Sequence, residues 1–197
     1  FIPARGHIQN AKELLNAIIK EGLTDIRWAA YIRADNLDAE LAELMVKTGM
    51  SYFEIGITSG SQELVRKMFM GYNLKTVLKN CELLAEAGFK DHVSVNYSFN
   101  VIDERPETIR QTVAYHRELE RIFGANKVEP AIFFIGLQPH TRLEKYGFDK
   151  GLINKGYNPM SMMPWTARKL LWNPEPMGKT FGNICLEAFD TNPNDFG

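Results

Sequence analysis

The segment from residue 26 to residue 58, IRWAAYIRADNLDAELAELMVKTGMSYFEIGIT, decides the fold class. Residues 26–33 alternate in side-chain character with the period of a strand. Residues 38–48 place apolar side chains at helical spacing, and Gly49 is a suitable residue to end that helix. Residues 52–58 again have strand character. A strand, a helix and a second strand in this order are typical of two parallel strands joined by a crossover helix.

The same alternation recurs along the chain. It predicts strands at 26–33, 52–58, 93–102 and 128–137, and helices at 7–21, 38–48, 61–68, 74–88 and 107–123. Four strands are too few to close a barrel. We therefore predict an α/β fold over residues 1–139: a partial (βα) barrel, that is, an open TIM-like half-barrel of parallel strands with outer helices. Residues 140–197 are rich in proline and are predicted to form an extension of short helices and loops.

Composition narrows the function classes. The formal net charge of −1 provides no strong field for phosphate backbones or anionic lipid, so we expect neither a nucleic acid nor a membrane partner. The chain lacks a membrane-spanning apolar run and a secretion signal, so we expect a cytoplasmic location. Two cysteines exclude a disulfide scaffold and any metal site built from three or four thiolates of this chain alone. Without an initiator Met, the chain reads as an excerpt.

The third predicted strand carries a row of small polar side chains on one face. Ser94, Asn96, Ser98 and Asn100 alternate there with apolar residues. Both faces of a strand in such a barrel are covered, so a polar row indicates either a lumen that binds a polar ligand or a hydrogen-bonded core. We favour the ligand, because such barrels bind at the carboxyl ends of their strands, where Ser98 and Asn100 lie.

The first two strands carry further candidates at the same ends. Tyr31 and Arg33 share a face, and Arg33 can bind the carboxylate of a ligand or an acidic side chain of its own protein. Gly56 leaves room for the close approach of a ligand. The loop that starts at Thr58 leads to Ser61 as a helix N-cap, which suits an anion or is an ordinary turn with a serine cap.

At these residues the chain resembles the radical SAM superfamily, most closely its cobalamin-binding branch. The segments that carry the resemblance are residues 26–35, which end in Arg-x-Asp; FEIGITSGSQ at 53–62, similar to G-I-E-S-G-S; PET at 106–108; QPHTRL at 138–143; GLI at 151–153; and WNPEP at 172–176.

The resemblance implies an enzyme of oxidoreductase or methyltransferase type. In this family a 4Fe-4S cluster reductively cleaves S-adenosylmethionine to a 5'-deoxyadenosyl radical, which acts on a small-molecule substrate, and the branch adds cobalamin. By position, Tyr31 and Arg33 correspond to polar residues near the ribose and methionine moiety. Residues 56–60, with Gly56, Thr58, Ser59 and Gly60, correspond to the strand that lines the cofactor, and residues 100–103 to the strand end beside the adenine. The resemblance assigns neither a catalytic residue nor a metal ligand here.

Two departures from the family pattern leave alternatives open. The Cys-x3-Cys-x2-Cys motif is absent, Cys81 is most simply a core thiol, and Thr58 stands where the family commonly has Glu. We therefore expect a C-terminal fragment that is inactive alone. The alternatives are a degenerate barrel that binds a nucleoside-like or amino-acid ligand without redox chemistry, or another barrel enzyme that uses Arg33, Asp35 and Glu54 for acid-base work. An unfinished barrel also exposes a strand edge through which copies could self-associate.

Overall fold

The computed structural model describes residues 7–153, 171, 172 and 174. These residues belong to two compact units, each considered by itself. Unit 1 comprises the described residues within 1–97 and 111–131, and unit 2 those within 98–110 and 132–197. The domain boundary predicted after residue 139 stays a prediction.

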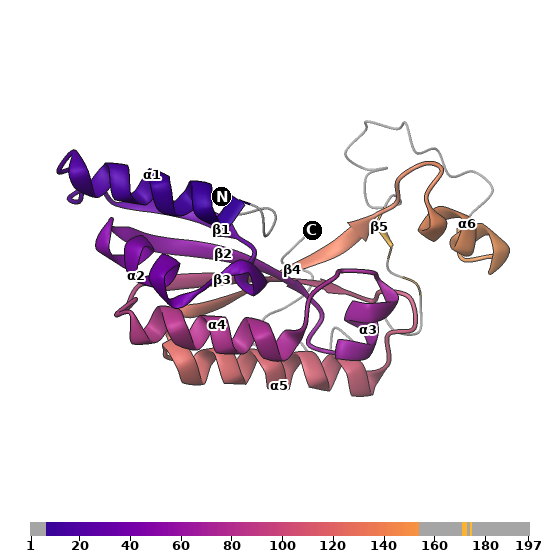
Figure 1. The fold of residues 1–197 in the computed structure, drawn as a ribbon. Helices are drawn as coiled ribbons and strands as arrows, with labels where there is room; N and C mark the ends of the chain where they lie inside the picture. The colour runs from indigo at the N-terminus through magenta and orange to yellow at the C-terminus, as the bar shows by residue number, and fades with distance from the viewer. Residues whose placement is uncertain (1–6, 154–170, 173, 175–197) are drawn as a thin grey trace. The chain divides into compact units, whose positions relative to one another are not determined.

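Strands and helices alternate along the chain, as the sequence predicted (Figure 1). The elements are α1 (Ile8–Lys20), β1 (Trp28–Ile32), the 3-10 helix η2 (Ala34–Asn36), α2 (Ala39–Lys47), β2 (Met50–Thr58), α3 (Gln62–Lys67), α4 (Leu74–Glu86), β3 (His92–Phe99), α5 (Pro106–Phe123), β4 (Val128–Gly136), α6 (Arg142–Asp149) and β5 (Leu171–Trp172). The strand order is β1-β2-β3-β4-β5, and β1 to β4 are parallel. The open α/β half-barrel is therefore confirmed.

Local signals fix where the helices of unit 1 begin and end. The Asp38 carboxylate caps α2 by accepting a hydrogen bond from the Leu41 backbone N–H at 2.9 Å, and the Asn73 side chain caps α4 in the same way. Gly49 follows α2 with φ at +90°, where a Cβ would overlap the Ile26 carbonyl. Ser61 precedes α3 as predicted, but its hydroxyl makes no cap hydrogen bond.

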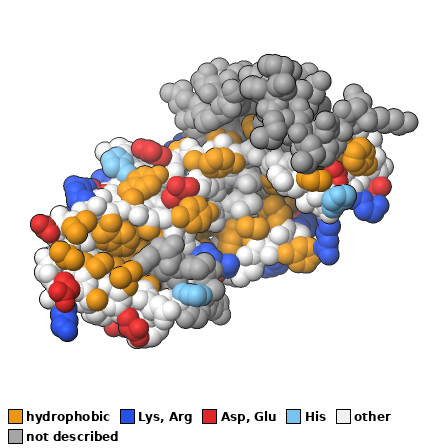
Figure 2. Space-filling view, turned by 90° about the horizontal axis from the view of Figure 1, so that it is seen from above, with side chains coloured by type: hydrophobic (Ala, Val, Ile, Leu, Met, Phe, Trp, Pro, Cys, Tyr) orange, Lys and Arg blue, Asp and Glu red, His pale blue; other side chains and the backbone are white. Residues whose placement is uncertain are grey.

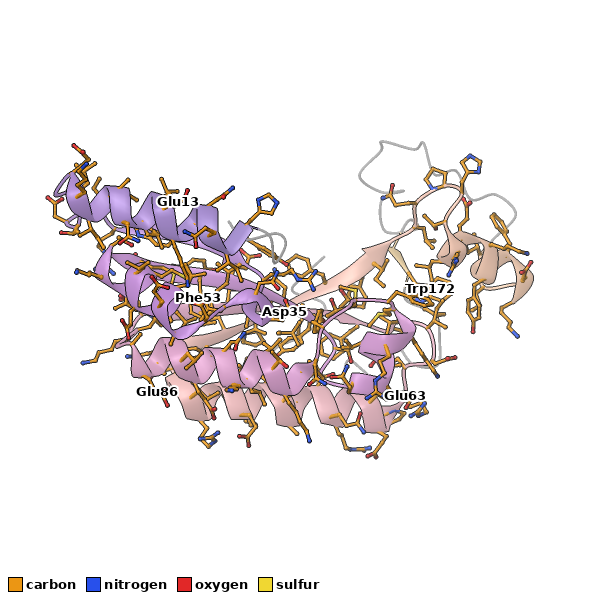
Figure 3. The ribbon with its side chains drawn as sticks, in the orientation of Figure 1. Glu13, Asp35, Phe53, Glu63, Glu86 and Trp172 are labelled. Atoms are coloured by element: carbon orange, nitrogen blue, oxygen red, sulfur yellow. The ribbon has the colours of Figure 1, made fainter. Side chains whose placement is uncertain are left out.

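The core of unit 1 lies between the sheet and the helices. Phe53 of β2 is fully buried there (Figure 3) and meets Phe89 and Phe123 edge to face, with ring centroids 5.0 and 5.6 Å away. Helices α4 and α5 run side by side along this layer (Figure 1), and the Tyr115 hydroxyl of α5 donates to the Leu74 carbonyl at 3.1 Å.

The other face of the sheet is less covered. Along β2, Phe53, Ile55 and Ile57 are buried, whereas Glu54, Gly56 and Thr58 are only half-buried. On β3, Asn96 and Ser98 share this intermediate exposure, while Ser94 is buried. The part of the predicted polar row within unit 1 therefore lies on the face away from the aromatic core, which we call the polar face (Ser94 and Asn96 of β3 with Glu54, Gly56 and Thr58 of β2).

Strand β1 stands at one end of the strand order. Large hydrophobic side chains from α1, β1 and the segment between them are about half exposed, namely Leu14, Leu23, Ile26 and Tyr31. Figure 2 shows that hydrophobic side chains reach the surface of the described part of the chain. Self-association through this edge remains a prediction.

Unit 2 has its own small core around β5. Strand β5 pairs antiparallel with the end of β4, and Trp172 packs with Leu137 and Ile153. Gly147 of α6 lies against Ile153 so closely that a Cβ would overlap its side chain. Helix α6 agrees with the short helices predicted after residue 139, but the sequence did not predict β5. Residues 173, 175 and 176 of the WNPEP segment lie outside the described residues. None of the described helices has the length and hydropathy to cross a membrane.

Candidate functional site

Tyr31 and Gly56 lie together at the carboxyl-terminal halves of β1 and β2. Tyr31 is 53% exposed, and its hydroxyl lies where a side chain at position 56 would be, since a Cβ there would overlap the phenol oxygen. The absence of a side chain at Gly56 thus lets the Tyr31 phenol lie across β2. The Tyr31 side chain therefore occupies part of the space above Gly56 in which we expected a ligand.

Arg33 follows β1 directly and binds an acidic side chain of its own unit. Its Nε and Nη2 donate to Oδ1 and Oδ2 of Asp35 at 2.8 and 3.0 Å, a two-pronged pair. The hydrogen bond to Asp35 raises the pKa of Arg33 above its ordinary value. Asp35, labelled in Figure 3, is nearly buried: 5% of its side chain is exposed, against 40% for the side chain of Arg33. One of the two alternatives for Arg33 is therefore realised, and a guanidinium has further N–H donors for a ligand.

Thr58 ends β2 in a strained conformation. Its φ of +60° is left-handed, and the register with β3 shifts between Gly56 and Thr58. Beside it, the Tyr72 hydroxyl donates to the Ile57 carbonyl. Burial raises the pKa of Tyr72 to about 12, and the charges of Asp35 and Arg33 also act on it. Tyr72 therefore lies close to both strand ends, although no pattern in the sequence indicates it.

Ser59 and Gly60 are tied to α5. The Gly60 N–H donates to the Thr112 hydroxyl at 2.9 Å, and Ser59, 1% exposed, lies with its hydroxyl 3.4 Å from the same oxygen. A Cβ at position 60 would come within 2.5 Å of the Thr112 Cα and 2.7 Å of the Tyr115 Cβ. The contacts that the structure gives these two residues are internal, and their role in cofactor binding stays a prediction.

Ser98 and Asn100 belong to unit 2. Ser98 is half-buried at the end of β3, and Asn100 follows with a left-handed φ of +55° and 2% exposure. The Asn100 amide donates to the Pro174 carbonyl at 3.0 Å. The structure therefore gathers Tyr31, Arg33, Gly56 and Thr58 within unit 1, whereas Ser98 and Asn100 are placed only within unit 2.

Glu54 and Asn96 are polar-face residues that the sequence analysis did not assign to the cofactor site. The Asn96 Nδ2 donates to Glu54 Oε1, while the Asn96 Oδ1 is buried without a hydrogen-bond partner among the described residues. Strand alternation had placed both residues on the correct face. The sequence pattern does not indicate the register of β2 and β3, in which Gly56 pairs with Asn96 and Glu54 with Ser94.

The part of the chain that the structure describes does not bring metal-ligating side chains together. It contains no group of three or more His, Cys, Asp or Glu residues that could hold a metal ion. Cys81 is fully buried on α4, and burial raises its pKa to about 12, so it stays a protonated core thiol. Cys185 lies outside the described residues. The described residues therefore do not fit an iron-sulfur cluster.

The fold and the polar strand ends define an α/β half-barrel of the kind that binds ligands at the carboxyl ends of its strands. The radical SAM superfamily model matches residues 7–115, more than half of the chain. The chain therefore belongs to the radical SAM superfamily.

Solved structures share this fold. The radical S-adenosylmethionine methyltransferase TsrM from Kitasatospora setae, bound to tryptophan substrate and the analogue aza-SAM, is 16% identical, with a TM-score of 0.61 over 97% of this chain and 41% of that chain. The cobalamin-dependent S-adenosylmethionine radical enzyme OxsB, with aqua-cobalamin and S-adenosylmethionine bound, is 12% identical, with a TM-score of 0.58 over 78% and 27%. The chain spans less than half the length of either. No curated protein matches it.

Proposed function

We propose that this chain is the C-terminal part of the barrel of a longer radical SAM enzyme, of oxidoreductase or methyltransferase type, in the cobalamin-binding branch. The observation that carries the proposal is the gathering of Tyr31, Arg33, Gly56 and Thr58 at adjacent parallel strand ends in a chain of this family. We propose that the enzyme is located in the cytoplasm and acts on a small-molecule substrate.

Bound S-adenosylmethionine supplies, on reductive cleavage, the 5'-deoxyadenosyl radical that acts on the substrate. The residues of this chain bind and orient it. Arg33, held by Asp35, uses two of its five N–H donors on that carboxylate and keeps others for the methionyl carboxylate. Tyr31 and Thr58 are assigned to the ribose side, with Gly56 and the loop of Ser59 and Gly60. In unit 2 we assign Ser98 and Asn100 to the adenine side.

The test uses the full-length protein, reconstituted anaerobically with iron and sulfide and given S-adenosylmethionine and a reductant. We expect the visible absorbance of a 4Fe-4S cluster and release of 5'-deoxyadenosine. Absence of both would sink the redox assignment. Arg33→Lys should raise the KM for S-adenosylmethionine about tenfold or more, because an ammonium cannot replace the two-pronged pair with Asp35. Arg27→Lys, at an exposed arginine before β1, is the matched control and should leave this KM unchanged.

A second candidate is a barrel that binds a nucleoside-like or amino-acid ligand without redox chemistry. Thr58 favours this candidate, because it is uncharged. Its hydroxyl can form a hydrogen bond with a ribose, and this bond does not require an iron-sulfur cluster. Calorimetric titration of the iron-free protein with 5'-methylthioadenosine and S-adenosylmethionine separates the two candidates. Tight binding without cluster formation under any reconstitution supports the second.

A further inference from the structure

The polar face of unit 1 carries more hydrogen-bond acceptors than donors around Glu54. Asn96 Nδ2 donates to the Glu54 carboxylate, and this bond fixes the orientation of the amide, because the flipped amide would point its oxygen at a carboxylate oxygen. The Asn96 Oδ1 must therefore point elsewhere, and it is buried without a partner among the described residues. A buried acceptor left unpaired is costly, so this oxygen demands a donor.

An aromatic ring adjoins this acceptor pair. Tyr31 is the register partner of Glu54 across the β1–β2 pair, and Gly56 is the partner of Asn96 across the β2–β3 pair. Register partners in neighbouring strands project from the same face of a sheet. Three adjacent strands thus bring together a phenol ring, a carboxylate and an unpaired amide oxygen, with the phenol lying over Gly56.

A primary ammonium group matches this arrangement. It has three N–H donors and no acceptor, it bears the charge opposite to that of Glu54, and it is attracted to an aromatic face. A hydroxyl could satisfy one acceptor but would leave the carboxylate charge uncompensated. In the described part of the chain no cationic side chain forms an ion pair with Glu54, so the described residues do not compensate this charge.

We propose that Glu54 and Asn96, with the ring of Tyr31, bind the primary ammonium group of a small-molecule ligand on the polar face. The proposal rests on the proposed function, in which this face is the ligand side of the barrel. The ammonium group has two possible sources: the methionyl group of S-adenosylmethionine or an amine on the substrate. Glu54 and Asn96 then restrict the enzyme to ligands that carry such a group.

The test is a calorimetric titration of the full-length protein with two matched pairs of probes. The pairs are S-adenosylmethionine with its deaminated analogue, and tryptamine with 3-ethylindole. We expect at least one amine to bind about tenfold or more tightly than its amine-free partner, and Glu54→Gln to abolish that preference. Glu43→Gln, at an exposed position of α2, should leave it intact. Loss of preference for S-adenosylmethionine assigns the site to the cofactor, and loss for tryptamine assigns it to the substrate.

A second measurement does not depend on a variant. In the ¹⁵N-labelled wild-type protein, the Asn96 side-chain amide signals should shift on addition of the preferred amine and stay unchanged with its amine-free partner. If neither amine is preferred, or if Glu54→Gln keeps the preference, the inference is overturned. The tryptamine arm and the Asn96 signals need no cluster and no cleavage of S-adenosylmethionine, so failure here is distinguishable from failure of the proposed redox function.

Discussion

Each unit buries an ionisable side chain of a different kind, His116 in unit 1 and Glu104 in unit 2, and burial shifts their pKa values in opposite directions. In unit 1, His116 is 1% exposed, and burial lowers its pKa to about 4. In unit 2, Glu104 is 7% exposed, and burial raises its pKa to about 7. Burial disfavours the charged form in both, so the base binds its proton less tightly and the acid more tightly. The units should therefore respond to pH with opposite slopes.

The units also differ in how much apolar packing supports them. Unit 1 encloses the edge-to-face aromatic cluster around Phe53, whereas the cluster of buried residues described around β5 in unit 2 contains a single aromatic ring, Trp172, packed with Leu137 and Ile153. Unit 1 should therefore be the more costly to disrupt by a single truncation.

The largest effect is expected for Phe53→Ala in unit 1. It removes a fully buried ring that two other rings contact, so the free energy of unfolding should fall by about 3–5 kcal/mol. Urea denaturation followed by circular dichroism measures the change. Phe148→Ala, at a 46% exposed phenylalanine of α6 in unit 2, is the matched control and should cost well under half as much. Equal losses would contradict the difference between the units.

Glu104→Gln should change the pH dependence of unit 2. The folded-state pKa of about 7 lies above the ordinary 4.5, so the folded state holds its proton longer than the unfolded chain. Stability is therefore full below pH 4.5 and is lost as pH rises through 7, by up to about 3 kcal/mol. Gln mimics the protonated acid, so the free energy of unfolding of the variant should exceed that of the wild type at pH 8 and equal it at pH 4. Urea midpoints at both pH values provide the measurement.

His116→Asn should act in the opposite direction in unit 1. The folded-state pKa of about 4 lies below the ordinary 6.5, so between these values the unfolded chain binds more protons. Stability is then lost as pH falls from 6.5 toward 4, by up to about 3 kcal/mol. Asn retains an amide near the position of Nδ1 but does not titrate. A variant whose urea midpoint still falls with the wild-type slope between pH 6.5 and 4.5 would contradict the assignment.

The smallest effect concerns the left-handed residues at the two strand ends. Thr58→Gly in unit 1 relieves a β-branched residue at φ +60° and should stabilise the protein by up to about 1 kcal/mol. Asn100→Gly in unit 2 should not stabilise the protein, because Asn tolerates this conformation. The substitution would also remove the hydrogen bond from the side-chain amide to the Pro174 carbonyl. Thermal midpoints of the two variants test the contrast.

The sequence predicted the fold well because its signals are local. The alternation in 26–33 and 52–58, and the capping residues Asp38 and Gly49, depend only on neighbouring residues, and the structure shows the elements where these signals place them. The polar row of β3 was likewise placed on the correct face by strand periodicity alone.

The candidate site was less predictable because its contacts join residues far apart in the chain. No local pattern indicates that Gly60 must fit against Thr112 of α5, or that Asn96 bonds Glu54 across the sheet. The strand β5 spans two residues and owes its existence to pairing with β4, so it has no periodicity to detect.

The surroundings of the buried His116 ring favour one of its two neutral tautomers. The Tyr97 hydroxyl lies 3.1 Å from Nδ1, and the Glu120 carboxylate lies 3.8 Å from Nε2. A carboxylate only accepts, so it favours the tautomer with the hydrogen on Nε2, which leaves Nδ1 to accept from the phenol. Burial raises the pKa of Tyr97 well above its ordinary value, so that phenol keeps its hydrogen. The ¹⁵N resonances of this one imidazole therefore report, without any added probe, whether the layer between sheet and helices is intact.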